Sequence, residues 1–292
     1  MIQAEDYPYP VQKIKLSAGP ELAYIEVGEG PHTLLFVHGF ASHLPVWAHN
    51  LEVLKKYYRC LALDLPGHGL SEIKDYPYTI SFYAEVVQSF IEDKKLGPMT
   101  LIGHSMGGQI SSRLAIDHAQ SLQQLVLVAP AGFETFTMTE KALMRQFTTS
   151  SILSGSQYWK WALNLKNYFY ELNEKEYEKL NEFNRNFYSI RSNPLLPKIL
   201  SRSVNGMIDE PIFEDLEKIA CPTLVFFGKQ DLLIPNRFLH QLSTQDLAER
   251  GVRRIPQGQL KMYEKSGHFL QYEHPARFNM DLYKFLNPLI FQ

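Results

Sequence analysis

The serine with the most informative surroundings in this 292-residue chain is Ser105, at the centre of Gly103–Gly107 (Gly-His-Ser-Met-Gly). The apolar run Met99–Ile102 before it predicts a buried strand, and Gln109–Ala119 after it predicts a helix. A serine at such a strand-to-helix turn projects its hydroxyl above the sheet edge, and the flanking glycines permit the strained backbone. Ser105 is therefore a candidate nucleophile, although a serine here could also serve as an ordinary helix N-cap.

An acid and a base follow Ser105 later in the chain. The apolar run Leu224–Phe227 predicts another buried strand, and it leads within four residues to Asp231. His268 lies in a late loop, before the amphipathic stretch Pro275–Leu286. A neutral imidazole can take the proton of a serine during attack, and a carboxylate can orient that imidazole. We therefore interpret Ser105, Asp231 and His268 as nucleophile, orienting acid and general base.

Four further segments accompany the serine pentapeptide in a fixed order. They are His38-Gly39-Phe40, Asp64–Ser71 (Asp-Leu-Pro-Gly-His-Gly-Leu-Ser), Gly228–Asp231 with Pro235, and Gly267-His268 with Glu273 and Pro275. With these motifs the chain resembles the α/β-hydrolase superfamily, and more narrowly its cap-bearing esterase, C–C hydrolase and non-haem peroxidase-like branch. The resemblance spans nearly the whole sequence and implies catalysis without a metal or another cofactor.

The resemblance also implies roles for residues around the three candidates. The backbone N–H groups of Phe40 and Met106 would form the oxyanion hole, and Asp64 would fix a loop. Some relatives take the acid from the end of an earlier strand, which makes Glu134 the alternative to Asp231. His38 and His104 are expected to be structural.

Apolar runs alternate with segments of helical period along most of the chain, which predicts an α/β fold with a mostly parallel sheet flanked by helices. Val11–Leu16 and Leu22–Val27 predict an N-terminal hairpin. The alternation stops after Pro130, and helical character follows until a strand restarts beyond Ile219. We interpret this stretch as an inserted helical cap, residues 133–213, in a hydrolase core formed by residues 1–132 and 214–292.

Aromatic residues are concentrated in the predicted cap, where most are expected to form its own core. Some should line a pocket between the cap and the core, because ligand sites commonly lie between two structural units and have apolar walls. The predicted lining residues are Trp47, Phe133, Trp159 and Phe269.

Composition is that of an ordinary globular protein, with 45% hydrophobic and 21% charged residues. Its 29 basic and 31 acidic residues nearly cancel, so we expect no nucleic-acid partner and no binding to an anionic membrane. The chain has neither a signal-like N-terminus nor a run of 18 apolar residues, which favours a cytoplasmic location. We expect a monomer or a homodimer. Cys60 and Cys221 are expected to be unpaired, and no metal-binding motif is present.

The type of nucleophile narrows the expected reaction. Dehalogenating and epoxide-opening relatives carry an aspartate where this chain has Ser105. Ser105–Gly108 resembles the C–C hydrolases of meta-cleavage products, but their Gly-Pro-Gly loop is replaced by Phe40–His43. We therefore predict a carboxylesterase that cleaves small to medium acyl esters or thioesters through an acyl-enzyme. The alternatives are C–C bond hydrolysis and a small-ligand receptor with weak or no turnover.

Overall fold

The computed structural model describes residues 4–17, 19–149, 168–171, 174 and 194–288. Its centre is a sheet of eight strands in the order β1-β2-β4-β3-β5-β6-β7-β8. β1 and β2 are antiparallel to their neighbours, and β3 to β8 pair in parallel. The strands are β1 (Gln12–Lys15), β2 (Glu21–Val27), β3 (Thr33–Val37), β4 (Arg59–Leu63), β5 (Met99–His104), β6 (Leu122–Val128), β7 (Thr223–Gly228) and β8 (Gly258–Tyr263).

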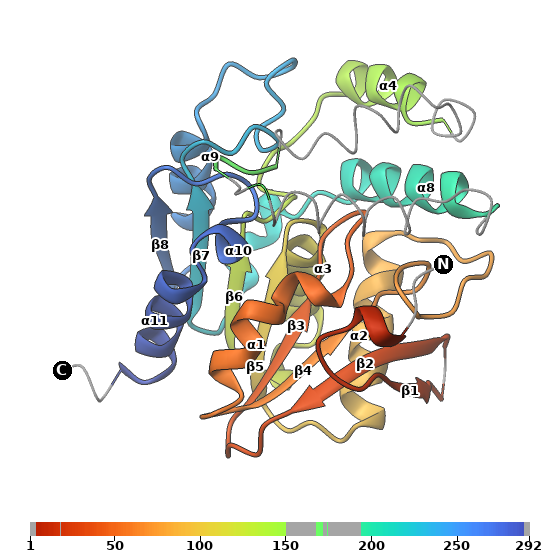
Figure 1. Cartoon of the computed structure of the whole chain (residues 1–292). Helices are drawn as coiled ribbons and strands as arrows, with labels where there is room; N and C mark the ends of the chain where they lie inside the picture. Colours follow the sequence, from red (N-terminus) through yellow and green to blue (C-terminus); the bar gives the residue numbers. More distant parts are fainter. Residues whose placement is uncertain (1–3, 18, 150–167, 172–173, 175–193, 289–292) are drawn as a thin grey trace.

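Helices cover both faces of the sheet, as Figure 1 shows. One face packs against α2 (Ile80–Asp93), α3 (Met106–Asp117) and α9 (Thr244–Val252), and the other packs against α1 (Ala48–Leu54) and α11 (Pro275–Leu286). The remaining described helices are η1 (Ala4–Asp6), η2 (Leu44–Trp47), η3 (Ala119–Ser121), α4 (Met138–Phe147), α8 (Leu196–Asp209), η5 (Phe213–Lys218) and α10 (Leu270–Glu273).

The central strands are apolar runs because both of their faces are buried. In β3, Leu35 and Val37 pack on the α2 and α3 side, whereas Leu34 and Phe36 pack on the α1 and α11 side. Successive side chains of a strand point to opposite faces, so a strand between two helical layers needs apolar residues at every position. This pattern identified the strands, and the fold prediction is confirmed.

Neither β8 nor α9 was predicted from the sequence. Gln259 and Lys261 of β8 are exposed, because this strand forms the edge of the sheet. Its sequence, Gly-Gln-Leu-Lys-Met-Tyr, therefore lacks the continuous apolar run that marked the central strands.

The predicted insertion lies between β6 and β7, and its described helices differ in how they contact the core. Ile199 and Leu200 of α8 are buried, and the Ser203 hydroxyl lies 3.1 Å from the Tyr83 hydroxyl of α2. None of the residues of α4 is buried. The division of the chain at residues 132 and 213 stays a prediction. No helix within the described residues is long and apolar enough to cross a membrane.

Candidate active site

Ser105 occupies the turn between β5 and α3, with φ 54° and ψ −117°. Residues other than glycine rarely adopt a positive φ, so this conformation must be held by its surroundings. The Ser105 N–H donates to the Val128 carbonyl (2.9 Å), and the Ala131 N–H donates to the Ser105 carbonyl (3.0 Å). The Ser105 side chain does not cap α3. The N-cap interpretation is therefore wrong, and the hydroxyl is not committed to the helix.

The glycines on either side of Ser105 are required by close packing. A Cβ atom at Gly103 would lie 2.3 Å from the Gly107 carbonyl oxygen, and one at Gly107 would lie 2.4 Å from the His38 carbonyl oxygen. Both distances are far shorter than real contacts of a Cβ atom. Strand, helix and the loop after β3 can approach one another only because these two positions lack side chains.

Asp231 and His268 meet above the carboxyl ends of β7 and β8. The Nδ1–H of His268 donates to Oδ2 of Asp231 over 2.7 Å, and the two side chains are 3% and 0% exposed. The other carboxylate oxygen of Asp231 accepts the N–H groups of Leu233 (2.8 Å) and Ile234 (3.1 Å). These bonds fix the carboxylate, and the carboxylate in turn fixes the imidazole tautomer with Nε2 unprotonated.

His104 connects the serine turn to the histidine loop. Its Nε2–H donates to the His268 carbonyl over 3.0 Å, and the two imidazole rings lie 4.9 Å apart. Burial lowers the pKa of His104 well below its ordinary value, so the ring is neutral. No hydrogen bond joins the Ser105 hydroxyl to His268 among the described residues, and such contacts often tighten only when a substrate binds.

The loop after β3 lies against Ser105. A Cβ atom at Gly39 would be 3.0 Å from the Cβ atom of Ser105. The loop is fixed by His38, whose Nδ1–H donates to the Gly39 carbonyl (2.8 Å) and whose Nε2 accepts the Leu65 N–H (3.0 Å). The structural role expected for His38 is confirmed. Neither the Phe40 N–H nor the Met106 N–H has an acceptor among the described residues.

Asp64 anchors the neighbouring loops from a fully buried position. Its carboxylate accepts the Leu44 N–H (2.8 Å), the Leu70 N–H (2.9 Å) and the Tyr7 hydroxyl (2.5 Å). Burial raises the pKa of Asp64 to about 6, and the hydrogen bonds lower it only in part. The loop-fixing role expected for Asp64 is confirmed, whereas the contribution of Tyr7 was not predicted because its position in the sequence shows no link to that loop.

The sequence profile of the alpha/beta hydrolase fold matches residues 32–275. The chain belongs to the α/β-hydrolase family. Among its curated relatives is the pimeloyl-[acyl-carrier protein] methyl ester esterase of Nitrosomonas europaea, 26% identical over 271 residues, which are 86% of this chain and 94% of the relative. The dihydrolipoyllysine-residue acetyltransferase component of the acetoin cleaving system of Cupriavidus necator is 38% identical over 115 residues. That match covers 39% of this chain and 31% of the relative.

Solved structures agree with the family assignment of this α/β-hydrolase. A thermophilic esterase from Thermogutta terrifontis superposes with a TM-score of 0.79 and 24% sequence identity, covering 96% of this chain and 99% of that chain. At this level of identity the likeness concerns the fold. A further relative is the monoacylglycerol lipase ABHD6 of Mus musculus, 25% identical over 259 residues, which are 84% of this chain and 72% of the relative. The family model and these esterase and lipase relatives support the assignment of this chain as a hydrolase.

Two of the predicted pocket residues belong to the hydrophobic core of this α/β-hydrolase. Trp47 is 0% exposed and packs against Phe36, and Phe133 is 1% exposed and packs against Phe227. Both rings are therefore packed inside the core, and a pocket role for either of them stays a prediction. Both are large apolar side chains near the catalytic motifs, and sequence alone does not show which way they point.

Phe269 does lie beside the candidate catalytic residues of the α/β-hydrolase. Its partly exposed ring is 5.7 Å from the His268 ring and 4.5 Å from the His104 ring. It also stacks on Phe169 at 5.1 Å. Its pocket role stays a prediction, and Trp159 lies outside the described residues.

The alternative acid, Glu134, faces a different histidine. Its carboxylate lies 2.5 Å from Nδ1 of His240 and accepts the Asn236 N–H over 2.8 Å. Nε2 of His240 lies 3.3 Å from Glu140 of α4. Among the described residues, no group of three or more His, Cys, Asp or Glu side chains is arranged to hold a metal ion. The Glu134–His240 pair therefore connects the loop after β6, α4 and the loop after β7 of this α/β-hydrolase.

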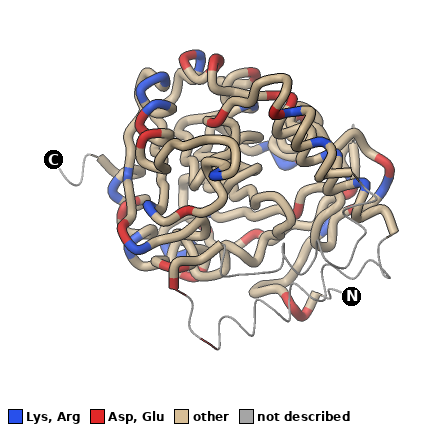
Figure 2. Tube along the Cα trace, turned by 90° about the horizontal axis from the view of Figure 1, so that it is seen from above, with Lys and Arg blue, Asp and Glu red and all other residues tan. Residues whose placement is uncertain are grey.

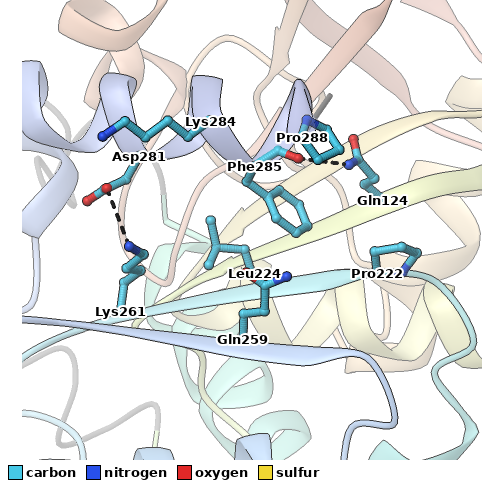
Figure 3. A pocket seen from close by; sticks show the side chains of 9 residues that line it. All are labelled: Gln124, Pro222, Leu224, Gln259, Lys261, Asp281, Lys284, Phe285 and Pro288. Atoms are coloured by element: carbon cyan, nitrogen blue, oxygen red, sulfur yellow. Dashed lines mark hydrogen bonds and ion pairs between the residues drawn. The ribbon is translucent and has the colours of Figure 1, made fainter. Parts of the chain in front are cut away.

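A hollow of about 270 Å³ lies near the amino ends of β6, β7 and β8 (Figure 3). Ser105, Asp231 and His268 all follow carboxyl ends of strands, where open α/β sheets bind their ligands. In the hollow, Lys261 and Asp281 form an ion pair over 3.7 Å. Because the hollow lies at the amino ends of the strands and the three candidate catalytic residues lie at the carboxyl ends, the hollow is separate from the candidate active site.

Charged residues of both signs are interspersed along the described chain, as Figure 2 shows from above. The whole sequence carries a net charge of −2.

Proposed function

We propose that this protein is a serine hydrolase that cleaves small to medium carboxylic esters or thioesters, with Ser105 as nucleophile. The observation that carries the proposal is the Asp231–His268 bond, which is linked through His104 to a serine that stands on a strained turn and does not cap its helix. The esterases and lipases among the relatives support ester substrates.

In the proposed reaction His268 acts as the base. Asp231 holds the Nδ1 proton of His268, which leaves Nε2 free to accept the Ser105 proton as the hydroxyl attacks the acyl carbon. The imidazolium then returns the proton to the leaving alcohol or thiol, and an acyl-enzyme remains. Water attacks that ester with the same base, releases the acid and restores Ser105.

The Phe40 and Met106 N–H groups would stabilise the negative charge that develops on the acyl oxygen. They flank Ser105 on the loop after β3 and at the start of α3, and neither has an acceptor among the described residues. The positive end of the α3 dipole adds to their effect. Removing one oxyanion-hole donor typically costs about 100-fold to 1000-fold in rate.

The test is hydrolysis of p-nitrophenyl esters from acetate to laurate by the wild type and by Ser105→Ala. We expect Ser105→Ala to keep its fold and to lose about 1000-fold or more in turnover, because the acyl-enzyme can no longer form. Ser112→Ala is the matched control, since Ser112 lies on α3 and donates to the Gly108 carbonyl (2.9 Å). Near-normal turnover by Ser105→Ala would contradict the proposal.

A further inference from the structure

Glu273, at the end of α10, collects four hydrogen-bond donors from two separate segments. One carboxylate oxygen accepts the Gly267 N–H (2.6 Å) and the Ser266 hydroxyl (3.3 Å), both from the loop that carries His268. The other oxygen accepts the Tyr170 N–H (2.5 Å) and the Glu171 N–H (3.2 Å), both from the predicted cap. The hydrolysis proposed above assigns no role to this carboxylate.

The cap segment Tyr168–Glu171, which we call the docked segment, also bonds to the main chain of the histidine loop. The His268 N–H donates to the Tyr168 carbonyl over 2.8 Å. A Cβ atom at Gly267 would lie 2.7 Å from that same carbonyl oxygen, so the two chains touch along their backbones. Phe169 stacks on Phe269 with 5.1 Å between ring centroids.

His268 is consequently held at three points by three different parts of the chain. Asp231 holds its ring, His104 holds its carbonyl, and Tyr168 holds its N–H. Two of these partners belong to the α/β core, and the third belongs to the insertion. Only the third depends on the docked segment staying in place.

We propose that Glu273 is a positioning residue for the hydrolysis: it binds the docked segment to the histidine loop, and thereby makes the insertion part of the support of His268. This inference rests on the proposed function. It predicts that displacement of the docked segment slows the base-dependent step even though the docked segment supplies no reacting group.

A carboxylate suits this position better than any other side chain. It has two acceptor oxygens and no proton to donate, and bonds to an ionised acceptor are stronger than bonds to a neutral one. Burial raises the pKa of Glu273, while the Gly267, Tyr170 and Glu171 N–H groups lower it and favour the ionised form. A glutamine of the same shape would turn its NH₂ group, which is itself a donor, toward groups that also donate: either two N–H groups, or an N–H group and a hydroxyl.

The experiment measures how fast diisopropyl fluorophosphate labels Ser105, a reaction that needs His268 but no knowledge of the natural substrate. In that reaction the Ser105 oxygen bonds to phosphorus, fluoride leaves, and the hydroxyl proton passes to His268. We expect the labelling rate of Glu273→Gln to be lower than that of the wild type at the same pH by about tenfold or more. The reason is that displacing a catalytic group by about 1 Å can lower the rate by up to about 100-fold.

Glu264→Gln is the matched control. Glu264 precedes the histidine loop, is 65% exposed and pairs with Lys229. We expect its labelling rate to equal that of the wild type. If Glu273→Gln lowers the unfolding temperature but is labelled at the wild-type rate, Glu273 only stabilises the fold and the inference is overturned.

Phe169→Ala tests whether Glu273 acts through the docked segment. It removes the stacking on Phe269 without changing the carboxylate. If both residues hold the same segment, the double variant should lose less than the product of the two single losses. Fully multiplicative losses would overturn the proposed role of the docked segment.

The same measurement separates this inference from the proposed function. If Ser105 of the wild type is not labelled above the Ser105→Ala background, the proposed function fails. If Ser105 is labelled at the same rate in the wild type and in Glu273→Gln, the proposed function stands and the positioning role of Glu273 is rejected.

Discussion

The ends of the neighbouring strands β6 and β7 lead to two carboxylate–histidine pairs that have similar geometry and different surroundings. Asp231 meets Nδ1 of His268 at 2.7 Å, and Glu134 meets Nδ1 of His240 at 2.5 Å. Both carboxylates also accept backbone N–H groups of the loop after β7. A short contact between a carboxylate and an imidazole therefore does not by itself identify a catalytic pair.

The difference lies at the second nitrogen of each imidazole. Nε2 of His240 faces another carboxylate, Glu140. In His268 the carboxylate contact takes up Nδ1, and the residue is tied by its carbonyl to His104, next to Ser105. An imidazole whose two nitrogens both contact carboxylates, as in His240, has no nitrogen left to accept a proton from a serine, whereas Nε2 of His268 has no carboxylate partner among the described residues. The two pairs therefore differ in what the second imidazole nitrogen of the histidine contacts.

The largest effect should come from breaking the Asp231–His268 pair. In Asp231→Asn the amide NH₂ would face Nδ1, so His268 would carry its proton on Nε2 and could not accept one from Ser105. We expect a loss of about 1000-fold or more in turnover. Stability should change little, because the Asn oxygen can still accept the Leu233 and Ile234 N–H groups.

Glu134→Gln is the matched control for turnover, because it makes the same chemical change in the other pair. We expect its turnover on p-nitrophenyl esters to stay close to that of the wild type. A loss in Glu134→Gln equal to the one predicted for Asp231→Asn, with Asp231→Asn active, would transfer the role of the acid to Glu134.

The sequence supports much of this comparison and leaves its decisive step open. Continuous apolar runs predicted the central strands, and the Gly-His-Ser-Met-Gly turn predicted where Ser105 stands. Which carboxylate meets His268 depends on how the loops after β6 and β7 fold over the sheet edge, and no local pattern records that. The partners of Glu273 are mostly backbone amides, which any residue type supplies.

A third carboxylate sharpens the comparison, because Asp64 is buried without an imidazole partner. Burial raises its pKa from the ordinary 3.8 to about 6. At pH values between these two numbers, Asp64 carries a proton in the folded state but not in the unfolded state. The resulting stabilisation is complete below about pH 4 and is lost as the pH rises through about 6. The shift corresponds to about 3 kcal/mol of unfolding free energy.

Urea unfolding of the wild type and Asp64→Asn at several pH values measures this effect, since the variant has no titrating group at that position. The difference in unfolding free energy, wild type minus variant, should fall from pH 4 to pH 7. For Asp75→Asn the difference should instead rise with pH, and mainly below about pH 4, because ion pairs with Lys198 and Arg202 lower the pKa of the exposed Asp75 from its ordinary 3.8. A difference that rises with pH for Asp64 would mean that its hydrogen bonds outweigh its burial.

The smallest effect should come from breaking the Glu134–His240 pair, and it should appear in stability rather than in turnover. Glu134→Gln weakens the bonds to His240 and Asn236, and we expect a loss of about 1 to 2 kcal/mol in unfolding free energy. Denaturation of Glu134→Gln, His240→Gln and the double variant would measure how far the two side chains act together. If the single losses simply add, the pair contributes no coupling energy. The link between the loop after β6 and the loop after β7 would then come from other contacts, such as the stacking of Phe136 on His240 at 5.5 Å.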